Sequence, residues 1–386
     1  MSERPAIVSA FEHPLRKGPD YSALRFIGES AAGALADAGL KPGDIDGLAT
    51  AGETMAVNYI AEYLNLKPRW FDSTSIGGSS FLSHIMHASD AIRQGKARAV
   101  LLCYGSTARS SAAALGGSAR TLVIDAQGVG DSDYYYTPYG VNLVSQYALV
   151  ARRHMHEYGT TREQLAEIAV TCRTHAALNP LARFRDPITV ADVVKSRPVA
   201  EPLHLLDCCV ITDGGGAVIV AAPEVARNCK KKPIRVLGGS EAAAHREGGH
   251  HRLLDVAARQ SGPAAFAATG LKPSDVDFCM IYDSFTITVM TTLEGLGFCK
   301  PGEGGAFVQG GRIRLGGALP INPDGGALSN HHPGRRGIFL AIEAVRQLRG
   351  EGGPRQVKDA RIALCHGTGG YLSDRHSGVT LLLGAD

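Results

Sequence analysis

Residues 38–46 read A-G-L-K-P-G-D-I-D, and residues 269–277 read T-G-L-K-P-S-D-V-D. A second pair of related stretches follows in the same order, A-R-A-V-L-L-C-Y-G at 97–105 and A-R-I-A-L-C-H-G at 360–367. Each copy passes from an Ala-rich helix through the G-L-K-P turn to a strand, and later to another helix and strand. Two echoes in one order indicate a duplicated α/β unit. Because duplicated halves usually meet across a pseudo-twofold axis, we expect loops of both halves to face one site.

Composition limits the classes of protein to which the chain can belong. Its 386 residues suffice for two domains or one double domain, and 44% hydrophobic with 20% charged residues is typical of a globular protein. A net charge of +3 gives no argument for nucleic acid, and no apolar run is long enough to span a membrane. With no signal-peptide core and eight cysteines outside C-x-x-C spacing, we expect a cytoplasmic protein with reduced thiols and no metal site.

Strands and helices alternate along most of the chain, which favours an α/β layered fold. The predicted strands lie at 5–9, 45–51, 99–104, 210–221, 276–282, 361–366 and 378–383. The predicted helices outside the insertion lie at 22–39, 79–94, 253–269 and 335–348. Residues 106–200 break the alternation with two predicted helices, 143–158 and 162–178, and such insertions tend to carry substrate-binding loops. We therefore predict an N-terminal half, 1–240, that includes this insertion, and a C-terminal half, 241–386.

The two copies also indicate where a site would lie. When residues 92–94 (I-R-Q) are aligned with residues 345–347 (V-R-Q), residues 78–79 fall opposite residues 331–332. Both pairs are then predicted at a helix N-terminus behind a glycine-rich turn, where free N–H groups and the helix dipole favour negative charge. Two such ends facing one point would suit a developing oxyanion.

Several motifs together carry a resemblance to a known family. They are G-G-S-S-F-L-S-H (77–84), P-Y-G (138–140), Y-A-L-V-A-R-R-H-M-H-E-Y-G-T-T (147–161), L-L-D-C-C-V-I-T-D-G-G-G-A-V-I-V (205–220), Y-D-S-F (282–285), N-P-D-G-G-A-L-S-N-H-H-P-G (322–334) and C-H-G-T-G-G (365–370). Spread over nearly the whole chain, they resemble the thiolase superfamily, most closely its sterol-carrier-protein type. The resemblance implies a thiolase-like fold of duplicated α/β/α layered halves with a loop-domain insertion, and a homodimer.

The departures from the family pattern bear on the chemistry. Thiolases carry a nucleophilic cysteine where this chain has Gly78, and the H-D-C-F motif of the sterol-carrier type is Y-D-S-F here, beginning at Tyr282. The G-H-P histidine is kept as His332, and His366 corresponds most nearly to the cysteine of the family's C-terminal loop. Because a glycine cannot form an acyl-enzyme, the resemblance implies chemistry without a covalent intermediate.

These residues predict a site that stabilises the enolate of a coenzyme A thioester, with no bound cofactor. We expect His332 to act as acid or base, and Tyr282 to stand at the family's oxyanion-binding position. Main-chain N–H groups would hold the thioester oxygen at Gly78, Ser79, Gly367, Gly369 and Gly370. Such a site suits the retro-aldol cleavage of a β-hydroxyacyl-CoA. It resembles the thiolase-like proteins of steroid side-chain degradation, which also lack the cysteine and work with an OB-fold partner chain.

Alternatives stay open at several of these positions. Ser79 could replace the missing nucleophile, although a serine at a helix start more often caps the helix. Tyr282 could be a core tyrosine and His366 a packed loop residue, while Cys103 is interpreted as a structural thiol. For the whole protein the alternatives are a thiolase or acyltransferase with an atypical nucleophile, or a catalytically silent acyl-CoA-binding subunit.

Overall fold

One mixed sheet forms the frame of the part of the chain that the computed structural model describes, residues 4–52, 55–114, 139–245, 252–372 and 374–385. Its nine strands follow the order β3-β2-β4-β7-β1-β8-β11-β10-β9. They are β1 (Ala6–Glu12), β2 (Gly47–Ala49), β3 (Trp70–Asp72), β4 (Ala99–Ser106), β7 (Gly214–Ala221), β8 (Ile234–Ala244), β9 (Phe278–Ile281), β10 (Ile362–Tyr371) and β11 (Asp374–Gly384). Counted outward from the β1–β8 pairing, β1, β7, β4 and β2 match β8, β11, β10 and β9, as a duplicated unit requires.

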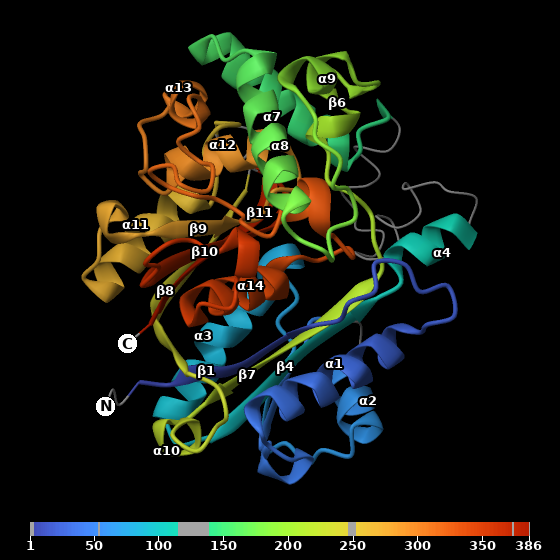
Figure 1. Cartoon of the computed structure of the whole chain (residues 1–386), viewed down its shortest axis with the longest axis vertical. Helices are drawn as coiled ribbons and strands as arrows, with labels where there is room; N and C mark the ends of the chain where they lie inside the picture. Colours follow the sequence, from blue (N-terminus) through green and yellow to red (C-terminus); the bar gives the residue numbers. More distant parts are fainter. Residues whose placement is uncertain (1–3, 53–54, 115–138, 246–251, 373, 386) are drawn as a thin grey trace.

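Helices alternate with the two halves of the sheet in layers (Figure 1). Helices α3 (Ser80–Arg93) and α14 (Gly337–Arg349) lie between the halves and contact strands of both. Helix α1 (Ala23–Ala38) covers the outer face of the first half, while α11 (Ala258–Thr269) and α12 (Thr286–Gly295) lie on the outer side of the second. The layers therefore run helix, sheet, helix, sheet, helix, which confirms the predicted α/β architecture of duplicated halves.

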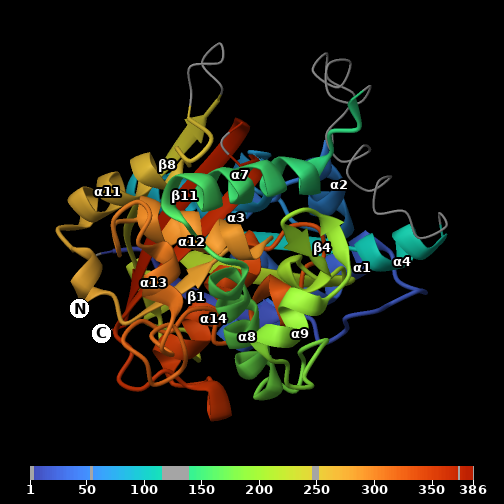
Figure 2. The same cartoon turned by 90° about the horizontal axis from the view of Figure 1, so that it is seen from above.

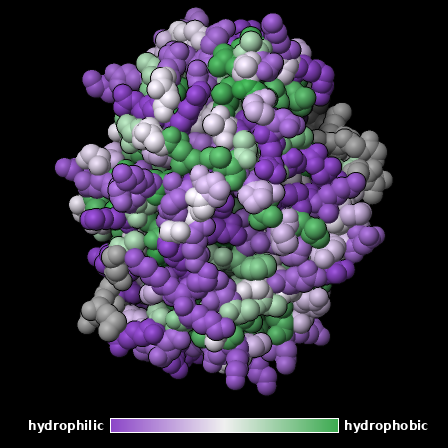
Figure 3. All heavy atoms as spheres, in the orientation of Figure 1, coloured by the Kyte–Doolittle hydropathy of each residue, from purple (hydrophilic) through white to green (hydrophobic). Residues whose placement is uncertain are grey.

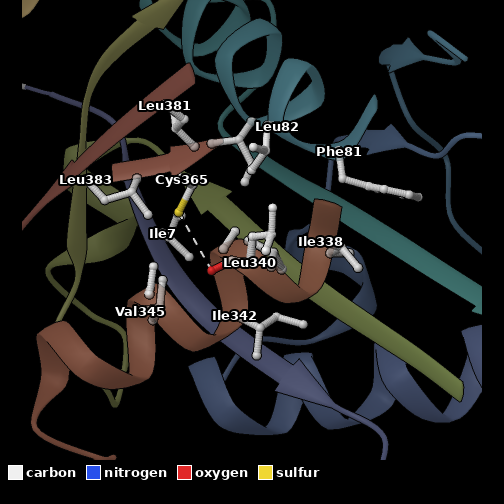
Figure 4. Close-up of a cluster of buried hydrophobic side chains, with 14 of the residues drawn as sticks. Ile7, Phe81, Leu82, Ile338, Leu340, Ile342, Val345, Cys365, Leu381 and Leu383 are labelled. Carbon is white, nitrogen blue, oxygen red and sulfur yellow. Dashed lines mark hydrogen bonds between the residues drawn. The ribbon is translucent and has the colours of Figure 1, made fainter. Parts of the chain in front are cut away.

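The central layer is the largest apolar core of the molecule. Side chains from α3, α14 and both halves of the sheet meet there, and most of them are fully buried. Figure 4 shows part of this cluster, with Leu82 of α3, Leu340 of α14 and Leu381 of β11 pointing toward one another. The Cys365 thiol lies in the same cluster, 3.7 Å from the carbonyl oxygen of Leu340. This core fixes the N-terminus of α3 and the C-terminal part of β10 relative to each other.

The insertion forms its own group of helices between β4 and β7. Its described elements are α4 (Ala108–Ala114), α7 (Leu143–Tyr158), α8 (Arg162–Ala177), α9 (Val190–Lys195), β5 (Pro198–Ala200) and β6 (Leu203–His204). The two predicted helices of this region are confirmed as α7 and α8, and both begin with a capping box, at Asn142 and at Thr161. Figures 1 and 2 show α7 and α8 over the second half of the sheet, and α9 packs against α8. Residues 115–138 of the predicted insertion lie outside the described residues.

The repeated sequence motifs build the same turn twice. After α1 and α11 the chain makes a short 3₁₀ turn, in which the Asp44 carboxylate accepts from the Lys41 N–H at 2.8 Å and Asp275 accepts from Lys272 at 2.9 Å. The next aspartate of each motif binds the start of a parallel neighbour of the strand that it precedes, β4 beside β2 and β10 beside β9. The contacts are Asp46 to the N–H groups of Arg98 and Ala99, and Asp277 to those of Arg361 and Ile362. In each half, the stretch that carries the G-L-K-P motif is therefore hydrogen-bonded to the stretch that carries the A-R motif.

Some elements were not predicted from the sequence. Strand β8 joins the halves, and α12 follows the Y-D-S-F motif directly. Smaller unpredicted elements are α2 (Ala56–Tyr63), β3, α10 (Pro223–Ala226) and α13 (Gly304–Val308). No helix within the described ranges is long and apolar enough to cross a membrane. On the face shown in Figure 3, polar side chains predominate and apolar ones form small groups.

Candidate active site

Tyr282 and His332 meet at the end of β9. Directly after the strand, the Tyr282 N–H donates to the His366 carbonyl of β10 at 2.9 Å, and the ring enters the central layer. The Tyr282 hydroxyl lies 2.8 Å from Nε2 of His332, with the two rings edge to face at 5.6 Å between centroids. The expectation that these two side chains lie close together is therefore met, although their chemical roles stay predictions.

Gly78 lies against the Tyr282 ring. A Cβ atom built on Gly78 would lie 2.6 Å from Cζ of Tyr282, closer still to its Cε2, and 2.5 Å from the carbonyl oxygen of Thr368. Gly78 does not have a positive φ, so a side chain is excluded by lack of space and not by the backbone. The tyrosine ring thus occupies the room in which a side chain at the family's nucleophile position would begin.

His331 and His332 do not lie at a helix N-terminus, and this part of the sequence alignment was wrong. A π-helical turn, η7 (Gly326–Asn330), precedes them, and α14 begins only at Gly337. Gly334, two residues after His332, has a φ of +87°, which is not helical, so no helix continues from His332. His332 is instead held by two hydrogen bonds with Thr212, the residue before the D-G-G-G run: its N–H donates to the hydroxyl at 3.1 Å, and its carbonyl accepts from the N–H at 3.2 Å.

The surroundings fix the protonation of both side chains. Desolvation, followed by the positive charge of Arg336, lowers the pKa of His332 to about 4. Desolvation raises the pKa of Tyr282 well above 10. At neutral pH the pair therefore consists of a neutral imidazole and a protonated phenol. One nitrogen of the neutral imidazole carries no proton and can accept one, and the hydroxyl can donate a hydrogen bond.

His366 is not brought to this pair. Its neighbour Cys365 belongs to the central core, and because side chains alternate along a strand, His366 points to the outer face of the sheet. There its Nδ1 lies 2.9 Å from the Thr380 hydroxyl, which in turn bonds Ser261 of α11. Burial lowers the pKa of His366 to about 3, so at neutral pH it is an uncharged side chain buried between the sheet and α11. The geometry favours the packed-residue alternative for His366.

Three of the glycines predicted to bind an oxyanion, Gly367, Gly369 and Gly370, lie in β10, which runs beside the other two predicted residues, Gly78 and Ser79. The His366 carbonyl points toward β9, so by alternation Gly367 and Gly369 direct their main-chain groups to β11, with which they pair. Thr368 points its carbonyl toward Gly78 instead, and Gly370 accepts from the Tyr147 hydroxyl at 3.3 Å. The carbonyl groups of Thr368 and Gly370 thus point toward Gly78 and Tyr147, whereas Gly367 and Gly369 face β11.

The Ser79 hydroxyl is engaged away from any base. It donates to the Ile76 carbonyl at 2.8 Å and lies 2.6 Å from the Ser377 hydroxyl, and the side chain is fully buried. The capping contact of this turn comes from Ser80, whose hydroxyl accepts from the Ile76 N–H at 2.9 Å. Neither partner of Ser79 can remove its proton, so the geometry argues against Ser79 as the nucleophile.

Sequence reasoning missed three buried charges that hold the site. Arg336 forms an ion pair with Asp324 at 2.6 Å and lies 3.4 Å from Asp283, the residue after Tyr282. Desolvation, partly offset by Arg336, raises the pKa of Asp283 to about 6. The available signal was the presence of charged residues inside otherwise apolar or glycine-rich motifs, Y-D-S-F and N-P-D-G-G, and the arginine pair after H-H-P-G.

Comparisons with known proteins identify the relatives of this chain. The family model described as thiolase C-terminal domain-like matches residues 243–383. A steroid side-chain-cleaving aldolase of Thermomonospora curvata is 35% identical over 96% of this chain and 95% of its own. Two more relatives are 35% identical over 91% of this chain and 92% of theirs. They are an acetyl-CoA acetyltransferase of Methanothermobacter thermautotrophicus and a 17-hydroxy-3-oxo-4-pregnene-20-carboxyl-CoA lyase of Mycobacterium tuberculosis.

Solved structures give the same result. The structure described as the Ltp2-ChsH2(DUF35) aldolase matches with a TM-score of 0.87 and 32% identity, over 100% of this chain and 98% of that chain. A human mitochondrial 3-ketoacyl-CoA thiolase matches with a TM-score of 0.71 at 15% identity, which supports the fold alone. The chain therefore belongs to the thiolase superfamily, as an aldolase related to the sterol-carrier-protein type.

Proposed function

We propose that the protein is a carbon–carbon lyase that cleaves a β-hydroxyacyl-CoA by retro-aldol chemistry, without an acyl-enzyme. One observation carries the proposal. The Tyr282 ring fills the space next to Gly78 where a nucleophilic side chain would begin, and it places a hydroxyl 2.8 Å from His332. The site has thus exchanged a nucleophile for a pair of groups that can move a proton.

The reaction needs only proton transfer and charge stabilisation. A base takes the proton of the β-hydroxyl, the Cα–Cβ bond breaks to give a carbonyl product, and its electrons form the thioester enolate. The enolate then takes a proton at Cα, so atoms and electrons balance without a redox partner. His332, neutral above pH 4, is the proton acceptor, and it is reached directly or through the Tyr282 hydroxyl. Once His332 holds the proton, its Nε2–H can donate to the Tyr282 oxygen, and the Tyr282 O–H can then donate a hydrogen bond to the enolate oxygen.

The substrate class follows from the relatives. The Mycobacterium tuberculosis lyase acts on 17-hydroxy-3-oxo-4-pregnene-20-carboxyl-CoA, and the Thermomonospora curvata relative is named for steroid side-chain cleavage. We therefore propose a steroid-like β-hydroxyacyl-CoA as the substrate. The aldolase of the solved structure is named for two components, which supports the expectation that an OB-fold partner chain works with this one. A homodimer stays an expectation of the family resemblance.

The acetyltransferase relative represents the rival function. Thiolase or acyltransferase chemistry of the family's kind needs a nucleophile that carries the acyl group. Gly78 has none, Ser79 has no base, and the pKa of Cys103 is raised by burial, which disfavours the thiolate. This combination favours the lyase over the acyltransferase.

Substitutions at the pair test the proposal. With the OB-fold partner present and 17-hydroxy-3-oxo-4-pregnene-20-carboxyl-CoA as the probe, Tyr282→Phe and His332→Ala should each lower turnover about a hundredfold to ten-thousandfold. Tyr282→Phe is the sharper variant, because it removes the hydroxyl and keeps the ring. Full activity of Tyr282→Phe would remove the hydroxyl from the mechanism. If wild type forms no carbonyl product but thiolyses a 3-ketoacyl-CoA, the acyltransferase replaces the lyase.

A further inference from the structure

The loop that carries His332 is held by one fully buried arginine. Nη1 of Arg336 donates to the carbonyl oxygen of His331 at 2.9 Å, and Nη2 donates to the Asp324 carboxylate at 2.6 Å. Its Nε lies 3.4 Å from Asp283. The Arg336 side chain has no exposed surface, so each of these contacts forms away from water.

The two carboxylates extend this network to both sides of the site. Asp283 accepts hydrogen bonds from the N–H groups of Ala327 and Leu328, at 2.7 and 3.1 Å. Asp324 accepts from the N–H of Gly326 and from the Asn330 side chain, both at 3.0 Å. Asp283 directly follows Tyr282, and the turn η7 leads to His332. The network therefore joins the end of β9, which carries Tyr282, to the loop that carries His332.

We propose that Arg336 is a positioning residue, which fixes the His332 loop against the end of β9 so that His332 and Tyr282 stay within hydrogen-bond reach. The role rests on the proposed function only where turnover is concerned, because the distance between the two side chains can be measured separately. The planar guanidinium hydrogen-bonds two acceptors, the His331 carbonyl and Asp324, and forms an ion pair with Asp283, an arrangement that a lysine ammonium cannot reproduce. A displacement of about 1 Å in such a pair is enough to lower turnover about a hundredfold.

The charge of Arg336 has a second, separable effect on His332. It is the largest contribution after desolvation to the lowered pKa of this histidine. The charged and titratable groups that interact with His332 are Arg336, Tyr282 and the neighbouring His331, and Thr212 adds a hydroxyl. Lysine at this position keeps the charge and loses the geometry, whereas methionine loses both. The two variants therefore separate alignment from electrostatics.

The experiment compares Arg336→Lys with Arg355→Lys as a matched control. Arg355 is a buried arginine bound to Glu343 by two hydrogen bonds of 2.9 Å, and its third hydrogen bond goes to the Gly352 carbonyl, outside the His332 loop. We expect Arg336→Lys to lower kcat about a hundredfold with KM within about threefold, and Arg355→Lys to leave kcat within about threefold of wild type. In a crystal structure of Arg336→Lys, Tyr282 Oη and His332 Nε2 should lie more than about 3.5 Å apart.

Titration of labelled histidines by NMR gives a readout that does not depend on turnover, with His332 assigned by its absence in His332→Gln. Its pKa should stay near 4 in Arg336→Lys and rise in Arg336→Met, while staying below the free value of about 6.5 because the larger cause, desolvation, remains. Asp283→Asn, which weakens the same clamp without removing the buried cation, replaces Arg336→Lys if that variant does not fold. The proposal is overturned if a folded clamp variant matches Arg355→Lys in kcat and keeps the 2.8 Å contact. If wild type has no lyase activity, the proposed function fails, and the distance and the pKa still decide the role of Arg336.

Discussion

Gly78→Ala tests whether Tyr282 and a side chain at the nucleophile position exclude each other. The added Cβ would meet the Tyr282 ring within 2.6 Å and the Thr368 carbonyl at 2.5 Å, far inside van der Waals contact. Overpacking of this kind lowers stability by about 1–3 kcal/mol. Alanine also restricts the unfolded chain more than glycine does, which raises stability by less than about 1 kcal/mol. We therefore expect a net loss of about 2 kcal/mol. At about 2 cal/mol/K per residue, the unfolding entropy of 386 residues makes this about 2–3 °C in Tm.

The assay is a double-mutant cycle of melting temperatures. In the Tyr282→Ala background the ring is absent and only the Thr368 contact remains, so Gly78→Ala should cost at least about 1 kcal/mol less there. Gly43→Ala is the control, because a Cβ built on Gly43 has no atom within 4 Å. The reasoning is refuted if Gly78→Ala melts like Gly43→Ala, or if its cost is the same with and without the tyrosine ring.

The remaining predictions concern pH and the serine beside Gly78. Buried histidines with lowered pKa values, such as His84 at about 4 and His366 at about 3, stay neutral in the folded chain while the unfolded chain takes up protons near pH 6.5. The free energy of unfolding should therefore fall by about 1.4 kcal/mol per pH unit for each such histidine, from pH 6.5 down to its folded pKa. Asp283 partly offsets this loss below pH 6, because its raised pKa of about 6 lets the folded chain take up a proton before the unfolded chain does. Tm measured from pH 7 to 4.5 checks this, and His366→Asn should flatten the slope; a Tm independent of pH would contradict it. Ser79→Ala should keep turnover within about threefold, because its hydroxyl is engaged by Ile76 and Ser377; a loss above about a hundredfold would restore Ser79 as the nucleophile.

Local patterns made much of the fold predictable. The G-L-K-P and A-R motifs act through hydrogen bonds of Asp46 and Asp277 to the following strand, so each copy specifies its own turn. Helix α12 was missed because its sequence, T-I-T-V-M-T-T-L, is rich in β-branched residues, and burial against neighbouring helices outweighs their weak helix propensity. Strand β8 was missed because its glycines and charged residues hide the strand pattern.

The family resemblance allowed the positions of several site residues to be predicted. It did not reveal the side-chain orientations and contacts that depend on three-dimensional packing. The proximity of Tyr282 and His332 followed from their motif positions. The orientation of His366 depends on the register of β10, which a short apolar run does not reveal. The exclusion between Gly78 and Tyr282 joins residues far apart in the chain, and Arg336 acts through buried partners that no local pattern contains.

The most direct test of the central claim is mass spectrometry of a reaction stopped during turnover. The protein, its OB-fold partner and a steroid-like β-hydroxyacyl-CoA are mixed, and the products and the intact protein are weighed together. We predict a carbonyl product and a shortened acyl-CoA in equal amounts, while the protein keeps its unmodified mass. An acyl adduct on Ser79 or on a cysteine, formed at the rate of turnover, would contradict lyase chemistry without an acyl-enzyme.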